Sequence, residues 1–400
     1  MFPSNLYKDK HILVGVTGCI AAYKSCEVIR FLVTRGAVVK VMMTEGAQQF
    51  ISRLTLETLS GNPVYRDMFP KEQFTGTHHI SLADWADAAI IAPATANILA
   101  KAANGIGDDF VSTTLLALHC PTVFAPAMNT NMWFNPAVQK NIRFLEKSGK
   151  LICYPEEGFL AEGYSGVGRL ARPEYLLQYL YKALHPASRS LEGKTVLITA
   201  GATREYLDPV RMITNPSSGK MGFTLAWEAF ARGARVILVH GETQLTPPVN
   251  VETYRAPTAR EMFERVEKLF PESDIFISAA AVSDYRPAKI SKEKIKKKDE
   301  QLTVSLEPTI DIIKEMARQK KPHQTVVGFA METDHPEQHA IQKLKSKKLD
   351  MIVLNDLSQT DAGFAVDTNR VTFFTPTQKK KLELMYKLDV AREVFNFLLP

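Results

Sequence analysis

The chain has 400 residues, of which 45% are hydrophobic and 23% are charged. This length is typical of two domains, and the composition excludes a disulfide-stabilised miniprotein, a fibre and an extensively disordered chain. The 49 lysines and arginines exceed the 43 aspartates and glutamates, which gives a net charge of +6. Six lysines lie between Lys289 and Lys298. Such a run is usually a solvated face, although it would also attract an anionic ligand.

Cysteine spacing and hydropathy indicate a cytoplasmic protein. The cysteines form neither a CxxC motif nor paired clusters, so we expect no zinc site and no disulfide framework. They are Cys19, Cys26, Cys120 and Cys153. The longest apolar runs, such as AAIIAPA at 88–94, are far shorter than the roughly 20 residues that a bilayer requires. The first residues, MFPSNLYKDK, contain no hydrophobic signal core. We therefore expect no membrane association.

Two segments begin alike, and each predicts the start of an α/β domain. HILVGVTGCIAAYK at 11–24 and KTVLITAGATREYLDP at 194–209 both run from an apolar stretch into a glycine-bearing turn. After the first segment, buried-strand patterns alternate with amphipathic patterns, including a helix expected from Glu45 and a last helix over 175–184. A polar connector follows, HPASRSLEGK, so we place a boundary near residue 188.

The second half repeats the alternation. Strands VLITA, RVILVHG, IFISAAA, TVVGFAM and MIVLND are separated by helical patterns. The lysine-rich segment interrupts this order and is followed by QLTVSL, which favours an additional strand. The predicted fold is therefore α/β, with two doubly wound parallel-sheet domains over residues 1–188 and 189–400.

Polar residues follow three buried strands of the first domain. The turn GVTGC follows the first strand, Thr95 and Asn97 follow AAIIAPA, and Asn129 with Met132 follows TVFAPAM. A single turn of this kind is weak evidence, because tight packing explains it equally well. Three neighbouring strand ends would, however, offer donors to one flat, phosphate-bearing ligand, and flavin mononucleotide (FMN) has that shape. Taken alone, Asn129 could equally be a helix N-cap, and His79 could be structural.

The second domain carries an anion-binding pattern. PSSGKMG supplies two hydroxyls, a small-residue turn and Lys220 at the expected start of a helix. The GxxxxGK spacing of a Walker A loop is absent. The lysine run follows the carboxyl end of a strand, where open α/β sheets bind ligands, so its lysines could reach phosphates.

At this point the motifs resemble known families. GVTGCIAAYK, HISLADWAD, APATAN and PAMNTNMW are similar to the flavin-dependent cysteine decarboxylases. ITAGATREYLDPVRMITNPSSGKMG, AAAVSDYRP, KEKIKK, GFAMET and LDMIVLND resemble phosphopantothenate–cysteine ligase. In this order, over residues 11 to about 390, they resemble the bacterial bifunctional enzymes of coenzyme A biosynthesis. The resemblance implies a flavodoxin-like flavin domain followed by a Rossmann-like ligase domain.

For the first domain, the resemblance implies FMN-dependent decarboxylation of phosphopantothenoylcysteine. The flavin oxidises the cysteine moiety, CO₂ leaves, and the reduced flavin returns hydride to the enethiol. His79 matches the family's active-site histidine, and Asn129 matches the asparagine that holds the substrate carboxylate. The implied cofactor contacts are Gly18, Ile20, Thr44, Thr95, Asn97 and Ser112.

One departure from the family concerns the final proton. The resemblance places a proton-donating cysteine in an ACG segment, but here GFLAEGYSGVGRL has Glu162 at that position. The nearest cysteine in sequence, Cys153, is expected in a strand. Glu162 could donate the proton if burial raised its pKa from about 4.3. Otherwise another group or water donates it, or the first domain stops at the enethiol or is inactive.

For the second domain, the resemblance implies activation of 4′-phosphopantothenate by CTP, followed by attack of the L-cysteine amine on the acyl-cytidylate. Asn215 matches the asparagine that stabilises this intermediate, and Asp284 contacts the nucleotide or its Mg²⁺. The implied nucleotide contacts are Ala280, Asp284, Lys294, Ile310, Asp311, Ile312, Ile313, Phe329, Lys343 and Lys347. The stretch EPTIDI differs from the family's KNPDI, which makes the placement of Asp311 less secure.

Three functional hypotheses follow. The first is a bifunctional enzyme that makes 4′-phosphopantetheine, using FMN and Mg²⁺, binding small molecules rather than nucleic acid, and forming a homo-oligomer. The second is an active ligase fused to a non-catalytic or enethiol-forming flavin module. The third is an NAD(P)-dependent oxidoreductase, against which the absence of GxGxxG turns counts.

Overall fold

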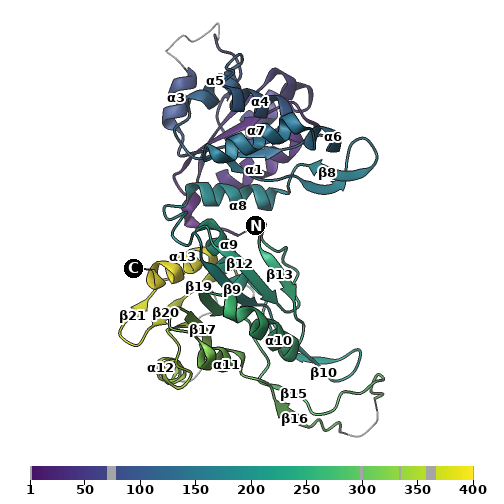
Figure 1. Ribbon diagram of the computed structural model, residues 1–400, viewed down its shortest axis with the longest axis vertical. Coiled ribbons are helices and arrows are strands. Elements are labelled where there is room, and N and C mark those ends of the chain that lie inside the picture. The colour runs from purple at the N-terminus through teal and green to yellow at the C-terminus, as the bar shows by residue number, and fades with distance from the viewer. Residues whose placement is uncertain (1, 70–77, 298–300, 333–334, 357–365, 400) are drawn as a thin grey trace. The chain divides into compact units, whose positions relative to one another are not determined.

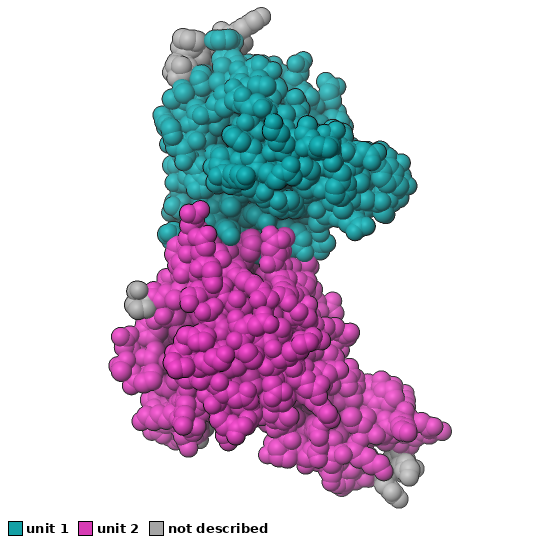
Figure 2. Space-filling view, viewed as in Figure 1, with its two compact units in different colours: residues 1, 5–186 teal, residues 2–4, 187–400 magenta. Residues whose placement is uncertain are grey.

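The computed structural model describes residues 2–69, 78–297, 301–332, 335–356 and 366–399. Within it, the chain divides into two compact units, which Figure 2 colours separately. Unit 1 comprises residues 5–186, and unit 2 comprises residues 2–4 and 187–400. The last lysine of the basic run, Lys298, lies outside the described residues.

Unit 1 is built on a six-stranded parallel sheet in the order β3-β2-β1-β4-β5-β6 (Figure 1). Its strands are β1 (His11–Val16), β2 (Val38–Met43), β3 (Val64–Tyr65), β4 (Ala88–Ala94), β5 (Thr122–Pro126) and β6 (Leu151–Ile152). Every residue of β4 and β5 is buried. Burial on both faces explains why these strands are continuous apolar runs rather than alternating patterns.

Helices pack on this sheet. They are α1 (Ser25–Val33), α2 (Arg53–Ser60), α3 (His78–Trp85), α4 (Ala96–Asn104), α5 (Phe110–Ala117), α6 (Thr130–Trp133), α7 (Pro136–Lys147) and α8 (Pro173–Leu184). α8 contacts α1, β4 and β5, whereas α4 contacts α5 and α7. A core that includes Leu13, Ile91 and Phe124 of the strands joins the sheet to α4, α5 and α7.

Two local predictions for unit 1 differ from the structure. The helix expected from Glu45 is only a 3-10 turn (Glu45–Gln49), and α2 begins later, where the Ser52 side chain accepts a hydrogen bond from the backbone of Thr55. Cys153 lies directly after β6 rather than within it, and its backbone N–H donates to Phe124 at 2.8 Å.

A two-stranded antiparallel hairpin, β7 (Glu156–Phe159) and β8 (Ser165–Arg169), extends from unit 1 (Figure 1). Its base is joined to the loop after β5, because Met128 N–H donates to the carbonyl of Gly168 at 3.0 Å. Gly168 has φ +147°, and a Cβ there would lie 2.0 Å from the Met128 carbonyl oxygen. Only glycine therefore allows this close approach.

Unit 2 contains an eight-stranded sheet in the order β13-β12-β9-β14-β17-β18-β20-β21. The first six strands are parallel and the last two are antiparallel additions at the edge. They are β9 (Thr195–Ala200), β12 (Arg235–His240), β13 (Glu252–Arg255), β14 (Ile275–Ser278), β17 (Thr325–Glu332), β18 (Met351–Asp356), β20 (Val371–Phe374) and β21 (Lys379–Lys381). The prediction of two doubly wound α/β domains is confirmed.

The helices of unit 2 alternate with these strands. They are α9 (Lys220–Ala231), α10 (Ala259–Leu269), α11 (Ile312–Gln319), α12 (Pro336–Ser346) and α13 (Lys387–Leu398). A core that includes Leu197, Phe276 and Val326 of the strands and Met316 of α11 joins the sheet to α10, α11 and α12.

Three short antiparallel pairs accompany this sheet. They are β10 (Arg204–Tyr206) with β11 (Met212–Thr214), β15 (Tyr285–Pro287) with β16 (Leu306–Pro308), and β19 (Thr368–Asn369) with β22 (Met385–Tyr386). The additional strand expected at QLTVSL is therefore displaced and begins only at Leu306. The β15–β16 arm projects from the body of unit 2 (Figure 1).

A buried ion pair lies within α9, which packs against α13. Arg232 and Glu228 are 2% and 0% exposed and are 2.6 Å apart. The guanidinium also donates to the backbone carbonyl of Arg392 and to Asn396 of α13, at 3.2 and 2.5 Å. These hydrogen bonds of Arg232 therefore join the end of α9 to α13.

Glu228→Ala should lower the free energy of unfolding of unit 2 by about 3–5 kcal/mol, because it leaves the Arg232 charge buried without its carboxylate. The exposed pair Arg260–Glu264 has the same i,i+4 spacing on α10 and provides the control. Glu264→Ala should cost less than about 1 kcal/mol. Urea unfolding, monitored by hydrogen exchange in α9 peptides, measures the free energy of unfolding of both variants. Equal effects would contradict the assigned importance of the buried pair.

Candidate functional sites

The strand order of unit 1 reverses between β1 and β4, which opens a crevice at their carboxyl ends. Thr17, directly after β1, joins the two strand ends. Its hydroxyl donates to the Pro93 carbonyl at 2.7 Å and accepts from the Thr95 backbone N–H at 3.1 Å. The sequence predicted polar groups at the ends of three neighbouring strands. The sheet order places β4 between β1 and β5, so the three strands that carry these groups are adjacent.

The loops after β1 and β2 meet through glycine. A Cβ on Gly18 would lie 3.0 Å from the backbone carbon of Gly46. Any side chain at Gly18 would therefore push the two loops apart. A Cβ on Gly46 would be 3.6 Å from Gly18, which is ordinary contact. Backbone N–H groups at such a turn can hold a phosphate, as the FMN prediction requires.

The loops after β1 and β5 and the β7–β8 hairpin enclose a cavity of about 380 Å³. Asn129 lines it, and its side-chain Nδ2 donates to the hydroxyl of Tyr164 in the hairpin at 2.6 Å. Asn129 also caps α6, since its oxygen accepts from the Asn131 backbone N–H at 2.8 Å. The two readings that the sequence left open, cavity residue and N-cap, are therefore compatible.

Two cations line this cavity, Lys24 and Arg169. Lys24 is buried, and its Nζ donates to the Leu170 carbonyl at 3.1 Å. Burial lowers the pKa of Lys24, and the positive charge of Arg169 lowers it further. An anionic group bound beside them would relieve this repulsion, so the cavity suits a carboxylate or phosphate.

Cys19 also lines the cavity, together with Glu162 at the tip of the hairpin. Burial raises the pKa of the Cys19 thiol, and a hydrogen bond with the Ala21 backbone opposes this effect. The negative charge of Glu162 adds a smaller increase, which Lys24 partly offsets. Cys19 is therefore protonated at neutral pH. Cys153, the cysteine nearest to Glu162 in the sequence, is fully buried after β6 and does not line this cavity.

The burial that proton donation by Glu162 would require is not found, because this side chain is exposed. Of the other predicted residues, Ile20 lines the cavity and is 58% exposed. Ser112 is buried, and its hydroxyl is engaged with Asp109 in the N-terminal cap of α5. His79 lies at the start of α3 and does not line the described cavity.

Thr44, Thr95 and Asn97 follow the strands as predicted. Thr44 precedes the 3-10 turn after β2, and Thr95 caps α4 by accepting from the Ile98 backbone N–H at 3.4 Å. Asn97, in the first turn of α4, is exposed. Their roles toward a flavin stay predictions.

In unit 2 the strand order reverses between β9 and β14. Asn215, directly after β11, contacts the segment that follows β14. Its Nδ2 lies 3.2 Å from the carbonyl oxygen of Ala281 and 3.3 Å from that of Val282, and it donates to both. The Asn215 amide is thereby held at the carboxyl edge of the sheet, beside Ala280.

The lysine-rich loop is fixed by a buried aspartate. Asp208 accepts hydrogen bonds from the backbone N–H groups of Val210, Arg211 and Ile295, at 2.7, 2.7 and 3.0 Å. Burial would raise the pKa of Asp208, but these three donors and the Arg211 charge hold it below its usual value. The backbone beside the exposed Lys294 is therefore anchored.

Two of the predicted nucleotide-binding lysines form ion pairs. Lys347 of α12 lies 2.7 Å from Asp311, which caps α11, and Lys343 lies 2.5 Å from Glu332 at the end of β17. Asp311 is thus brought together with Lys347, despite the unusual EPTIDI stretch. These lysines must exchange carboxylate partners for phosphates if a nucleotide binds here.

The three isoleucines among the predicted nucleotide contacts differ in burial. Ile312 is 4% exposed and packs in the core, so its side chain is unavailable to a nucleotide. Ile313 packs against the same core, whereas Ile310 is 42% exposed. Asp284 is exposed, and its carbonyl accepts from the Thr309 backbone at 2.9 Å, which places it beside Ile310.

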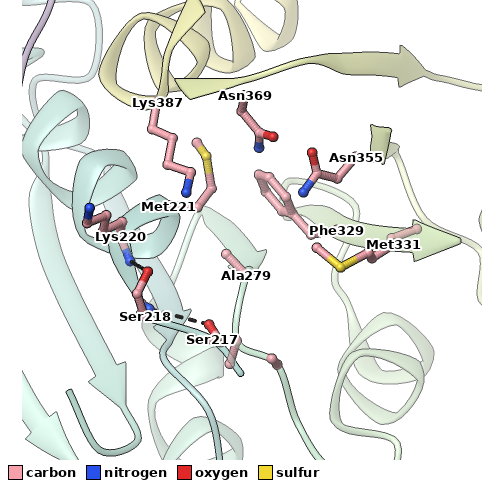
Figure 3. Close-up of a pocket in the computed structure, with 14 residues that line it drawn as sticks. Ser217, Ser218, Lys220, Met221, Ala279, Phe329, Met331, Asn355, Asn369 and Lys387 are labelled. Atoms are coloured by element: carbon pink, nitrogen blue, oxygen red, sulfur yellow. Dashed lines mark hydrogen bonds between the residues drawn. The ribbon is translucent and has the colours of Figure 1, made fainter. Parts of the chain in front are cut away.

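A cavity of about 150 Å³ lies between α9, β14, β17 and α13. Ala280 and Phe329, both predicted nucleotide contacts, line it together with Ser217, Ser218 and Lys220 from the start of α9 (Figure 3). Three further residues that were not predicted from the sequence line the same cavity: Asn355, Asn369 and Lys387. Their only signal was their positions at or beside strand ends, which many polar residues share.

No group of three or more metal-ligating side chains was found among the described residues. In the same described ranges, no helix is long and apolar enough to span a bilayer. Mg²⁺ binding at Asp284 therefore stays a prediction.

The architecture and the crevice in unit 1 define a two-domain α/β flavoprotein. Residues 3–185 match the family described as Flavoprotein, and residues 191–399 match the DNA/pantothenate metabolism flavoprotein C-terminal domain. The first match makes unit 1 a flavin-binding domain.

Full-length relatives identify the family more narrowly. The chain is 46% identical over 394 residues to the Coenzyme A biosynthesis bifunctional protein CoaBC of Bacillus subtilis (strain 168), covering 98% of this chain and 97% of the relative. It is 42% identical over 381 residues to the protein of the same name from Escherichia coli (strain K12), covering 94% of each. The chain belongs to the family of coenzyme A biosynthesis bifunctional proteins.

Among solved structures, the C-terminal domain of a Coenzyme A biosynthesis bifunctional protein CoaBC is 40% identical to this chain. The match covers 53% of this chain and 96% of the solved domain, with a TM-score of 0.46.

Gly18→Val should reduce flavin bound by the purified protein at least tenfold, because the new side chain separates the loops after β1 and β2. Gly46→Ala, at the facing position, should retain flavin within about twofold. Absorbance of flavin released by denaturation, per mole of protein, measures both. Full flavin occupancy in Gly18→Val would show that the cofactor does not use this pair of loops.

Proposed function

We propose that the protein ligates L-cysteine to 4′-phosphopantothenate in unit 2, and decarboxylates the product to 4′-phosphopantetheine in unit 1. The observation that carries this proposal is that each unit has its own cavity beside the carboxyl ends of its strands, in a chain that matches bifunctional relatives over almost its whole length. The two reactions therefore use separate sites.

The ligation begins when the carboxylate of 4′-phosphopantothenate attacks CTP, releasing pyrophosphate and forming an acyl-cytidylate. The cysteine amine then attacks the acyl carbon, a C–N bond forms, and cytidine monophosphate leaves. The Asn215 amide, which donates to the Ala281 and Val282 carbonyls, gives one of these hydrogen bonds to the acyl oxygen, where negative charge develops. Lys294, Lys343 and Lys347 bind the nucleotide phosphates, and Asp284 binds the Mg²⁺ that accompanies them.

The decarboxylation takes place in the cavity of unit 1. FMN, when bound, supplies the oxidation and reduction of the substrate's cysteine moiety. The amide of Asn129 orients the substrate carboxylate, and the charges of Lys24 and Arg169 attract it into the cavity. Gly18, Thr44 and Thr95 lie on the loops that would hold the cofactor.

The thiol of Cys19 is the proton donor that we assign to the last step. It is protonated at neutral pH and lines the cavity with Asn129, whereas Glu162 is exposed. The thiol gives its proton to the carbon that lost CO₂, and the resulting thiolate regains a proton from solvent. The charge of Glu162 then adds to the effect of burial in raising the pKa of the Cys19 thiol.

The proposal also includes assembly into a homo-oligomer and a location in the cytoplasm. His79 does not line the described cavity, so a homo-oligomer in which α3 of one copy faces the cavity of another would bring it there. All four cysteines are free thiols, which supports a reducing cytoplasm as the compartment.

A second function is favoured by one observation. Because Glu162 is exposed where the family carries a cysteine, unit 1 could bind flavin without completing the reduction. The assay below separates this case, because a scaffold releases no CO₂ and an incomplete enzyme accumulates the enethiol.

Mass spectrometry of products from 4′-phosphopantothenate, L-cysteine and CTP, with CO₂ measured in parallel, tests both activities in one reaction. Asn215→Asp should slow ligation by about 10²–10³-fold, because a carboxylate repels the developing negative charge that the amide stabilises. Decarboxylation of added phosphopantothenoylcysteine should stay within twofold. Equal loss of both activities in a folded variant would contradict two separate sites.

Cys19→Ser should release CO₂ but accumulate the enethiol, with formation of 4′-phosphopantetheine reduced at least about 100-fold, because a serine hydroxyl is a far weaker acid. Glu162→Gln should change this rate less than about tenfold. The reverse result would make Glu162 the donor. If neither change matters, water or another group protonates the product.

The effect of Glu162 on the Cys19 thiol can also be tested without substrate or flavin. Because the Glu162 charge raises the Cys19 pKa, Glu162→Gln should shift the pH profile of Cys19 alkylation by iodoacetamide to lower pH. Lys24, Arg169 and Tyr23 also line the cavity and are unchanged in this variant. An unshifted profile would show that Glu162 does not act on the thiol.

A further inference from the structure

Residues 2–4 are part of unit 2, although unit 1 lies between them and the rest of unit 2 in the sequence. We call these three residues the N-terminal segment. The Phe2 ring packs edge-on against Trp227 of α9, with the ring centroids 5.3 Å apart. The Ser4 hydroxyl donates to the Asp389 carboxylate of α13 at 2.7 Å. The N-terminal segment therefore contacts both α9 and α13.

These contacts are buried. Ser4 and Asp389 are each 1% exposed, Trp227 is 3% exposed, and Pro3 is buried as well. A buried carboxylate needs partners, and the Ser4 hydroxyl adds a hydrogen bond to the ion pair of Asp389 with Arg392, at 3.1 Å. Without the N-terminal segment, apolar surface of unit 2 would be exposed and Asp389 would lose a donor.

The N-terminal segment packs beside two lysines of the ligase cavity. Phe2 and Pro3 border one narrow space together with Lys220 and Lys387, the first residues of α9 and α13. That space has no room for a water molecule. The same two lysines line the cavity of unit 2 (Figure 3). They therefore lie between the cavity and the N-terminal segment.

The positions of these lysines depend on their surroundings. Lys220 forms an ion pair with Asp367 at 2.7 Å, and the Lys387 amine donates to the Val366 carbonyl at 2.6 Å. Burial, with the charge of Lys220, lowers the pKa of Lys387 to about 8, against the opposite effect of Asp367. Two cations that repel each other stay together only where the packing around them holds them.

The helices α9 and α13 are joined at a second place. The Arg232 guanidinium at the end of α9 donates to the Arg392 carbonyl and to Asn396 of α13, but Arg232 does not line the cavity. The contacts of the N-terminal segment thus join the two helices at the ends that carry Lys220 and Lys387.

We propose that the N-terminal segment is a positioning element of the ligase, which holds the first turns of α9 and α13 so that Lys220 and Lys387 face the cavity. This inference rests on the proposed ligase function. Ligation in unit 2 then depends on residues that precede the whole of unit 1 in the sequence, whereas decarboxylation in unit 1 does not depend on their contacts with α9 and α13.

In the full chain, Phe2→Gln combined with Ser4→Ala should lower kcat/KM for ligation at least tenfold, because the two lysines lose the packing that orients them. Decarboxylation of added phosphopantothenoylcysteine should stay within about twofold of the parent. Phe2→Tyr keeps the aromatic ring and should keep ligation within about twofold. Rates are measured at a temperature at which thermal unfolding shows each variant to be folded.

The surroundings of Lys387 can be measured directly. Acetylation of Lys387 by acetic anhydride at a series of pH values, with peptide mass spectrometry, reports the pKa of its amine. Because burial lowers this pKa, the double variant should move the midpoint upward from about 8. Lys220 and Asp367, whose charges act on Lys387, are unchanged in this variant.

Phe397→Gln is the matched control. Phe397 is partly buried, as Phe2 is, and its ring centroid lies 5.5 Å from that of the buried Phe373. It lies at the far end of α13 and borders neither the cavity nor the space beside Pro3. This variant should lower the unfolding temperature but leave ligation within about twofold and the acetylation profile of Lys387 unchanged.

Two results would overturn the proposal. Unchanged ligation in the folded double variant would show that the ligase does not need these contacts, whether or not the acetylation profile moves. Equal loss of ligation in Phe397→Gln would show a general effect of stability rather than positioning. If the double variant does not fold, Ser4→Ala alone takes its place under the same criteria. If the parent itself forms no ligation product, the proposed function fails, and the acetylation profile still tests the contact with Lys387.

Discussion

Both candidate sites depend on one geometrical constraint of parallel sheets. All strands end at the same edge, and where the strand order reverses, the connections leave in opposite directions and cannot fill the space between them. The reversal falls between β1 and β4 in unit 1 and between β9 and β14 in unit 2. At each one, a residue just beyond the first strand fixes the neighbouring loop: Thr17 bonds the backbone at Pro93, and the Thr203 N–H donates to Ala281. The crevice is thereby held open.

Electrostatics then distinguishes the two crevices. In unit 1, the buried Lys24 lies near Arg169, and both cations line the cavity together with the exposed Glu162. In unit 2, Lys343 and Lys347 are neutralised by Glu332 and Asp311. If a nucleotide binds these lysines as proposed, it must compete with their carboxylate partners, which lowers its net gain in binding free energy.

The sequence predicted the fold well because burial on both faces makes parallel strands continuous apolar runs, as β4 shows. It also located residues that directly follow strands, such as Thr95 and Asn129. It could not find Cys19, Asn369 or Lys387 as cavity residues, because the lining of each cavity comes from several separate segments of the chain. The motif match also did not reveal that the side chain of Ile312 packs in the core, so its predicted contact with the nucleotide would have to come from the backbone.

The pair of Cys19 and Glu162 illustrates how a site can keep its chemistry while its residues change. The two side chains come from different loops but line one cavity. Burial raises the pKa of the Cys19 thiol, and the negative charge of Glu162 adds to this effect from the exposed tip of the hairpin. If Cys19 is the acid as proposed, the proton comes from the loop after β1 rather than from the hairpin.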